Sequence, residues 1–441
     1  MQKKVWCIVL IAVLLTGFGT LAFAGGGKDT QTQGQQTLRL WDVVVRDPHP
    51  KARDMMIAEF QRRNPNVKVE TTTLTGDINQ KILTAASAKT LPDIVFVWGA
   101  GDVVTWGQMN ITTPVDDIVK EYGEKWWLSQ TQLGWFKMDG HYWGVPLVTF
   151  PDVLWYRADW FKEKGITKVP TTWAEWYDVA KKFVEDTNKD GQIDRWGLVL
   201  GIAEGWPFDD FRGGNADYWW DDKGNLTFGP KTIETLDFLG KMFRDTCYPG
   251  SVTFQNEGQR VGFIAGQGAT MVTSVSFVNT IIDQKGIDWF KNGTVGIAPV
   301  PMNRPFSEGA GANAGAHAIG IIDGPNSALA KNFLRFWISK DGLELYFCNN
   351  IPGHLPPYSV VWDSPKFKEA RKDYWQLYDV GRNIIAQSRW NHPTAKWQAI
   401  FGADGGGNAD VMSAVTVQKL PSATIMQKLI DTANKAKKEI Q

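Results

Sequence analysis

Strand-like and helix-like patterns alternate along the first hundred residues, and this alternation limits the possible folds more than any other feature of the sequence. Strand-like runs occur at 37–42, 67–70 and 92–98, the last of them apolar from Ile94 to Trp98. Between these runs, apolar residues recur at helical spacing over 52–60 and 77–87. Strand, helix, strand, helix, strand is typical of a parallel sheet covered by helices on both faces. The sequence therefore predicts an α/β fold.

Similar patterns continue through the rest of the 441 residues, a length that favours two domains over one. Thr172 and Glu175 form a capping box in front of an apolar helical stripe, which indicates core packing for that stripe. The run 309–318 consists mostly of Gly and Ala, so we expect close approach of backbone there rather than a core strand. A Lys-rich amphipathic helix is expected over 422–440.

The N-terminus has the pattern of a secretory signal. Lys3 and Lys4 precede an uncharged apolar run over 5–23, which ends on Ala22-Phe23-Ala24. We expect a signal peptide at 1–24, cleaved after Ala24, and a tether rich in Gly, Thr and Gln at 25–36. An uncleaved membrane anchor is the alternative, because a run of this length could span a bilayer. Cleavage is favoured by the small residues and the polar tract that follows, and it predicts a periplasmic protein.

Two cysteines remain after such cleavage, Cys247 and Cys348. In an oxidising compartment they could form a disulfide, and they could equally remain buried thiols. Their separation along the chain does not distinguish the two states.

The charge balance excludes one class of partner. Lys and Arg together number 47 and Asp and Glu together number 47, so the formal net charge is zero. Nucleic acids and anionic membrane surfaces select for a large basic excess. Neither is expected to bind this chain.

Motifs for covalent chemistry are missing from the sequence. Its five histidines are never within four residues of one another, and it contains no G-x-S-x-G elbow and no C-x-x-C pair. We therefore expect a protein that is not an enzyme. Adjacent acids at Asp209-Asp210 and Asp221-Asp222 keep a secreted carbohydrate-active enzyme as the alternative, because a glycosidase needs only two acids placed by the fold.

One loop matches the first nine positions of an EF-hand calcium loop. Its oxygen-bearing side chains and a glycine at the sixth position follow the calcium pattern, although Gly197 stands where a bidentate glutamate is usual. A turn rich in Asp and Asn without metal is the alternative. The expected ligands of a structural calcium ion are Asp186, Asn188, Asp190, Gln192 and Asp194.

Several segments together resemble one family, the extracellular solute-binding proteins of ABC importers, in the maltodextrin-binding-like group (family 1) that takes carbohydrates. The matching segments, in chain order, are Leu38-Arg39-Leu40-Trp41-Asp42, Phe60-Gln61-Arg62-Arg63-Asn64-Pro65, Val67-Lys68-Val69-Glu70, Leu91-Pro92-Asp93-Ile94-Val95, Tyr142-Trp143-Gly144-Val145-Pro146, Leu154-Trp155-Tyr156-Arg157-Ala158-Asp159-Trp160-Phe161, Val169-Pro170-Thr171-Thr172-Trp173-Ala174-Glu175-Trp176, 263–271 and Gly353-His354-Leu355-Pro356. No single segment is specific, but their order extends over nearly the whole mature chain.

The resemblance implies a two-lobed periplasmic-binding-protein fold with a hinge between the lobes. Lobe one is expected at 37–147 plus 269–316, and lobe two at 148–268 plus 317–441. The implied function is to bind a mono- or oligosaccharide between the lobes, as a monomer, and to deliver it to the membrane subunits of an ABC permease.

The ligand-binding residues are expected on loops after strand ends, where aromatic rings can stack on sugar faces and polar groups can pair with hydroxyls. An excess of tryptophan, 22 Trp against 10 Tyr, agrees with this chemistry. The expected residues are Trp41, Asp42, Trp98, Asp102, Phe150, Trp206, Asp210, Arg212, Trp219, Trp220, Ser274, Asn313 and His354. Arg212 is the only cation among them, which argues against the further alternative of a non-sugar solute such as a glycerol phosphate.

Overall fold

The computed structural model describes residues 35–46, 48–218, 227–388 and 407–440. The expected signal peptide at 1–24, most of the expected tether, and Trp219 and Trp220 lie outside the described residues. Within those residues, no helix combines the length and the apolar character needed to cross a bilayer.

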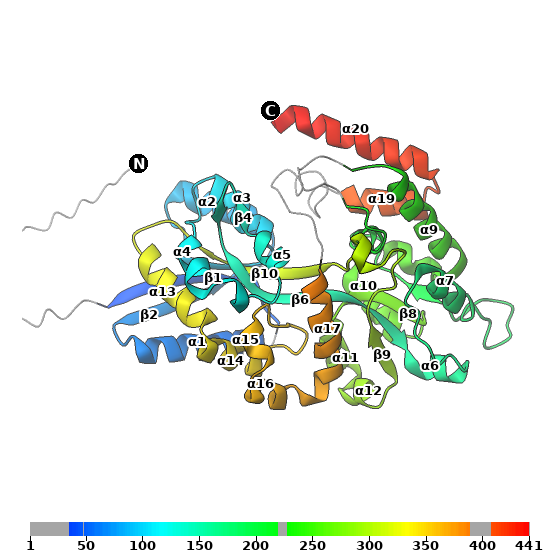
Figure 1. Cartoon of the computed structure of the whole chain (residues 1–441), viewed down its shortest axis with the longest axis horizontal. Coiled ribbons are helices and arrows are strands. Elements are labelled where there is room, and N and C mark those ends of the chain that lie inside the picture. The colour runs from blue at the N-terminus through cyan, green and yellow to red at the C-terminus, as the bar shows by residue number, and fades with distance from the viewer. Residues whose placement is uncertain (1–34, 47, 219–226, 389–406, 441) are drawn as a thin grey trace, which may run out of the picture. The chain divides into compact units, whose positions relative to one another are not determined.

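An eight-stranded sheet forms the centre of the fold, in the order β2-β1-β3-β10-β6-β8-β7, with β9 also pairing with β6 (Figure 1). Its strands are β1 (Gln36–Asp42), β2 (Val67–Thr73), β3 (Ile94–Val97), β6 (Val145–Arg157), β7 (Leu198–Val199), β8 (Thr270–Ser274), β9 (Val295–Ala298) and β10 (Ala314–Ile321). A separate two-stranded sheet consists of β4 (Lys137–Met138) and β5 (His141–Tyr142).

Helices connect these strands. In chain order they are α1 (His49–Arg63), α2 (Ile78–Ala88), α3 (Ala100–Gln108), α4 (Asp116–Tyr122), α5 (Gln130–Gly134), α6 (Ala158–Glu163), α7 (Trp173–Lys181), α8 (Pro207–Gly214), α9 (Pro230–Thr246), α10 (Asn256–Ile264), α11 (Phe277–Lys285), α12 (Asp288–Lys291), α13 (Ser327–Ile338), α14 (Lys340–Asn349), α15 (Ser359–Trp362), α16 (Pro365–Ala370), α17 (Trp375–Gln387), α19 (Gly407–Thr416) and α20 (Ser422–Ile440). The α/β fold and its first strand-helix-strand-helix-strand unit are therefore confirmed, with β1 parallel to both β2 and β3.

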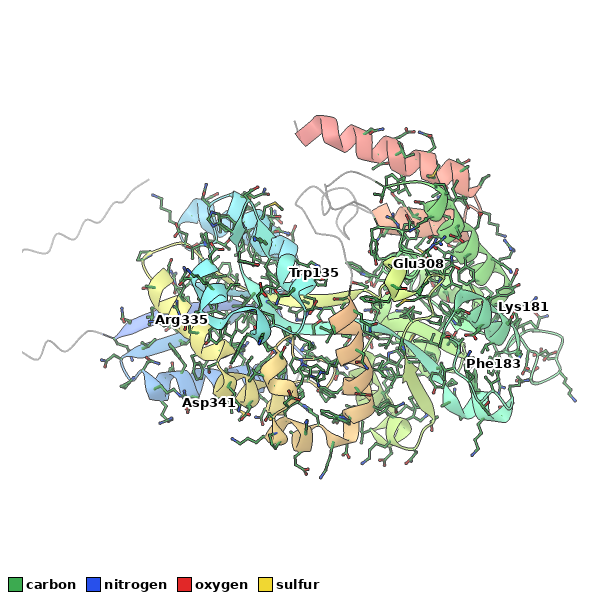
Figure 2. The ribbon with its side chains drawn as sticks, viewed as in Figure 1. Trp135, Lys181, Phe183, Glu308, Arg335 and Asp341 are labelled. Carbon is green, nitrogen blue, oxygen red and sulfur yellow. The ribbon has the colours of Figure 1, made fainter. Side chains whose placement is uncertain are left out.

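Local signals explain where several helices begin and which face they bury. The capping box of α7 is present, because Thr172 accepts from the backbone N–H of Glu175 while Glu175 accepts from that of Thr172. The stripe behind it is core, as expected. Phe183 is fully buried and lies 5.4 Å from the ring of Phe161, whereas Lys181 is exposed (Figure 2).

Strand β6 belongs to two parts of the sheet. Its first part pairs with β10, where Val145 is opposite Ile319 and Pro151 is opposite Ala314. Its second part pairs with β8 and β9, so that Asp152 is opposite Ser274. We call β2, β1, β3, β10 and the first part of β6 the first half-sheet, and the second part of β6 with β8, β9 and β7 the second half-sheet (Figure 1).

These pairings differ from the expected lobe segments. Strands β8 and β9 lie within 269–316, the segment expected in lobe one, yet both pair with the second part of β6. Helices α13 and α14 lie within 317–441, the segment expected in lobe two, yet they contact α1, and α13 also contacts β10 of the first half-sheet. The physical reason is that one thirteen-residue strand serves both half-sheets. The motifs along the chain carry no information about which part of that strand each later segment pairs with.

For the Gly- and Ala-rich run 309–318, one of the two expectations from the sequence is wrong and the other is confirmed. The expectation that it is not a core strand is wrong, because Ala314–Ile321 is β10 and lies between β3 and β6. The expected close approach is confirmed: a Cβ added at Gly213 would lie 2.3 Å from the backbone oxygen of Gly311. Gly213 is glycine at this position because the backbone of the segment around Gly311 occupies the space that a side chain would need.

Both cysteines are free thiols in the structure, so the disulfide alternative is not realised there. Cys247 is buried, and burial raises the pKa of its thiol to about 12. Cys348 is half-buried.

Candidate functional site

Four rings gather where β3, β6 and β10 lie side by side. His317 of β10 is at the centre, with ring centroids 4.8 Å from Phe150, 5.1 Å from Trp98 and 5.3 Å from His354. The two histidines are buried, whereas Trp98 is 51% exposed. We call these four residues the ring cluster. It presents one large exposed ring on buried support, which is the arrangement that stacks against an apolar face of a ligand.

The chain brings these rings together through backbone pairing. Trp98 directly follows β3, and Ala318 of β10 is opposite Val97. The turn that carries His354 is tied to β6, because Thr149 and Leu355 exchange backbone hydrogen bonds of 2.9 and 2.8 Å. The ring cluster is therefore fixed by sheet geometry rather than by loop conformation alone.

Burial disfavours the charged form of both histidines in the ring cluster. Burial lowers the pKa of His317 to about 3 and holds that of His354 well below its usual range. The Nδ1 atoms of both have no hydrogen-bond partner among the described residues. A buried polar atom without a partner is costly, so these nitrogens favour a ligand that can hydrogen-bond to them.

Three carboxyl groups lie beside this cluster: Asp152 of β6, and Asp209 and Asp210 of α8. Asp152 Oδ2 accepts a 2.9 Å hydrogen bond from Asn313 Nδ2, and Asp209 Oδ2 accepts a 2.7 Å hydrogen bond from Asn408 Nδ2. Burial, together with the neighbouring carboxyl groups, raises the pKa of Asp152 to about 7 and that of Asp210 well above its usual range. We call these three residues the acidic cluster.

Arg260 of α10 is the cation associated with the acidic cluster, since its charge acts on Asp152. It is 6% exposed, and its Nη2 donates to Ser274 Oγ at 3.1 Å and to Ser276 Oγ at 2.8 Å. Its Nη1 donates to Glu257 at 3.3 Å. The guanidinium is thus held at the start of the second half-sheet by two hydroxyls and one carboxylate.

Further polar atoms of the site also have no partner within the described part of the chain. They are Asp210 Oδ1, Asn313 Oδ1 and Arg260 Nε. Asp210 is only 4% exposed, and because its pKa is raised its carboxyl group can donate as well as accept. Together with the two histidine nitrogens, these atoms can both donate to and accept from a bound molecule.

The structure brings together six of the expected ligand-binding residues: Trp98, Phe150, Asp210, Ser274, Asn313 and His354. Trp206 stands at the start of α8, which carries Asp210, and is 37% exposed. Asp102 lies in the first turn of α3, and the partly buried Trp41 packs against the core beside β3. Trp219 and Trp220 are outside the described residues.

Two of the expected ligand-binding residues form ion pairs inside the protein. Asp42 is fully buried and accepts from His49 Nε2 at 2.9 Å and from Arg53 Nη1 at 2.8 Å. Arg212 is 2% exposed and is paired with Asp217 through bonds of 3.0 and 3.1 Å. Both residues are therefore reinterpreted as structural, because Asp42 at the end of β1 and Arg212 in α8 each belong to a buried ion pair.

Asp152, His317 and Arg260 were not identified from the sequence. One signal was available for His317, since it and Asn313 are the only polar side chains of any size within 310–318. Asp152 follows Phe150 by two residues on β6, and alternation along a strand would have placed them on one face. No sequence signal distinguishes Arg260 from other helical arginines.

The loop with the calcium-like pattern is ordered by its own side chains. Asp186 accepts from the backbone N–H groups of Asp190 and Gly191 at 3.2 and 2.8 Å, and Asp194 accepts from the backbone and hydroxyl of Thr187. Hydrogen bonds from Thr187 lower the pKa of Asp194. Over the residues described, no group of three or more His, Cys, Asp or Glu side chains is arranged to hold a metal ion. Calcium binding here stays a prediction.

Fold and site together define a two-lobed α/β solute-binding architecture. The model of the bacterial extracellular solute-binding protein family matches residues 47–344. The chain belongs to this family, and the resemblance drawn from the sequence is confirmed.

Two curated relatives are sugar-binding proteins by name. The arabinooligosaccharide-binding protein of Halalkalibacterium halodurans is 26% identical over 295 residues, which cover 62% of this chain and 59% of the relative. The polygalacturonan/rhamnogalacturonan-binding protein of Bacillus subtilis is 26% identical over 266 residues, which cover 55% of this chain and 49% of the relative. The chain thus matches between about half and three fifths of the length of these relatives.

A solved structure supports the fold over a longer range. The GacH receptor of Streptomyces glaucescens, solved unliganded and in complex with acarbose, is similar with a TM-score of 0.73 and 18% identity. The match covers 91% of this chain and 98% of the receptor. It confirms the fold class.

Proposed function

We propose that this chain is the substrate-binding component of an ABC sugar importer, which binds a mono- or oligosaccharide and delivers it to the membrane permease. The observation that carries the proposal is the exposed ring of Trp98, set on buried rings beside polar atoms that have no partner in the described structure. A sugar fits both features of this site, because its apolar face can stack on the Trp98 ring and its hydroxyls can form hydrogen bonds with the polar atoms. The curated relatives named for oligosaccharides support this substrate class.

The position of the site suggests how binding is coupled to delivery. Phe150 and Asp152 lie on either side of the point where β6 passes from one half-sheet to the other. A ligand that contacts both would favour a conformation with the two halves closed on it, and a permease would recognise that conformation. We further propose a monomer in the periplasm, released from its signal peptide after Ala24. Mass spectrometry of the secreted protein tests the cleavage site.

A thermal-shift screen against mono- and oligosaccharides tests the binding function. A ligand bound only by the folded state raises the melting temperature as its concentration rises. Isothermal titration calorimetry with each sugar that raises it then gives the affinity. A complete panel with no shift and no heat of binding would contradict the proposal.

One observation favours a second function, that of a carbohydrate-active enzyme. The pKa of Asp152 is raised to about 7 beside other carboxyl groups, and a glycosidase needs one such acid near a second carboxyl group. Incubation of the protein with the sugars that bind distinguishes the two functions. Recovery of unchanged sugar supports the importer component, and hydrolysed product supports the enzyme.

A further inference from the structure

Among the residues that the structure describes, one cation acts on the carboxyl groups of the acidic cluster. Arg260, its associated cation, already contacts Glu257 through Nη1. Arg212, which the sequence offers as a second cation on α8, is held by Asp217 in a buried pair. Among the described groups that act on Asp152 and Asp210, carboxyl groups therefore outnumber guanidinium groups.

The hydrogen-bonding atoms of the site point to the same kind of ligand. Asn313 Oδ1, an amide oxygen, is an acceptor without a partner in the described residues. Such an oxygen needs a ligand that donates. Arg260 Nε needs one that accepts. A sugar hydroxyl does both, whereas a carboxylate or phosphate oxygen only accepts and also brings a negative charge.

We propose that this site selects uncharged sugars and rejects their uronate and phosphate counterparts, because the carboxylate of Asp152 and the amide oxygen of Asn313 offer negative charge and an acceptor where an anionic ligand needs donors and positive charge. This inference rests on the proposed function and narrows it. It separates the chain from one of its own relatives, which is named for polygalacturonan, a polymer of acidic sugars.

The test is calorimetric binding of matched pairs: galactobiose with digalacturonate, cellobiose with cellobiouronate, and glucose with glucose 6-phosphate. Measurements at about pH 8 keep carboxylate ligands ionised and lie above the raised pKa of Asp152. The neutral member of any pair that binds should be at least about 30-fold tighter, as expected when one buried charge meets an unfavourable site. Equal or tighter binding of the charged member would overturn the inference while leaving the proposed function intact.

A variant connects the selectivity to this cluster. Asp152→Asn removes the negative charge and keeps an acceptor for Asn313 Nδ2, so the ratio of neutral to charged affinity should fall by about 10-fold. Asp341→Asn is the matched control, because Asp341 is 74% exposed on α14 and the change removes the same charge from the whole molecule (Figure 2). A melting curve shows that each variant is folded.

The outcomes are distinguishable. A ratio that falls in Asp152→Asn and not in Asp341→Asn supports the inference. A ratio that is unchanged in both variants overturns the assignment to the acidic cluster. If no member of any pair or of the wider sugar panel binds, the proposed function fails and the inference fails with it.

Discussion

Gly315 of β10 lies directly opposite Phe150 of β6, and the Phe150 ring covers the place where a side chain at residue 315 would begin. A Cβ built on Gly315 would lie 2.4 Å from Cε2 of Phe150, closer than real Cβ contacts. The ring in turn contacts His317 and His354. The missing side chain of one strand therefore sets the position of the ring cluster.

Gly315→Ala should displace the Phe150 ring. We expect a loss of about 1–3 kcal/mol in the free energy of unfolding, as for overpacking elsewhere, and weaker sugar binding. Urea unfolding and calorimetry measure the two effects. Gly324→Ala is the control, because a Cβ there meets nothing within 4 Å, and its stability should change by no more than about 0.5 kcal/mol. Equal effects of the two substitutions would contradict the packing argument.

Trp98→Ala should lower the affinity for sugar by about 10-fold or more, because the variant removes the exposed stacking surface. The free energy of unfolding should change little, since half of the residue is in contact with water. Met109→Ala is a suitable control, because Met109 directly follows helix α3, whereas Trp98 precedes it, and Met109 is 49% exposed. Titration calorimetry with a sugar that binds wild type compares the two. Similar losses in both variants would show that Trp98 has no special role.

The fully buried Asp42 predicts a pH-dependent contribution to stability. Burial alone would raise its pKa, but hydrogen bonds from His49, Val44 and Arg53 outweigh that effect and lower it. A lowered pKa in the folded state means that the contribution is present above the unfolded pKa of about 4 and is lost as the pH falls through the folded value.

Asp42→Asn should therefore cost about 3–5 kcal/mol of unfolding free energy at neutral pH, because Arg53 loses its buried partner. The cost should shrink as the pH falls toward the lowered pKa, where the wild-type carboxyl group also takes up a proton. Asp54→Asn is the control, since Asp54 pairs with the same Arg53 from a 62% exposed position. Urea unfolding across the pH range checks both; a cost for Asp42→Asn that is independent of pH would refute the ion-pair explanation.

The sequence predicts the parts of this fold that depend on local pattern. The early β1-α1-β2-α2-β3 unit follows from apolar periodicity, and the capped start of α7 from Thr172 and Glu175. The half-sheet to which β8 and β9 belong is not predictable in this way, because it depends on which part of β6 they pair with. A similar limit applies to the site residues. Trp98 and Phe150 follow from their positions after and within strands. Asp42 and Arg212 are instead paired with residues only five to eleven positions away, and the sequence pattern does not distinguish these partners from other nearby polar residues.

The loop at 186–194 predicts calcium-dependent stability. Asp186, Asn188 and Asp190 hold the loop in a turn through hydrogen bonds to one another and to its backbone, so calcium would have to draw these side chains together from their present hydrogen bonds. Because Gly197 offers no bidentate carboxylate, we expect weak binding, with a dissociation constant of roughly 10⁻⁴–10⁻³ M. Addition of about 5 mM calcium should raise the melting temperature of protein that has been treated with a chelator, and Asp190→Ala should abolish the rise. Magnesium at the same concentration is the control, since it favours stricter octahedral geometry. An identical melting temperature with and without calcium would show that the loop is a metal-free turn held by its own hydrogen bonds.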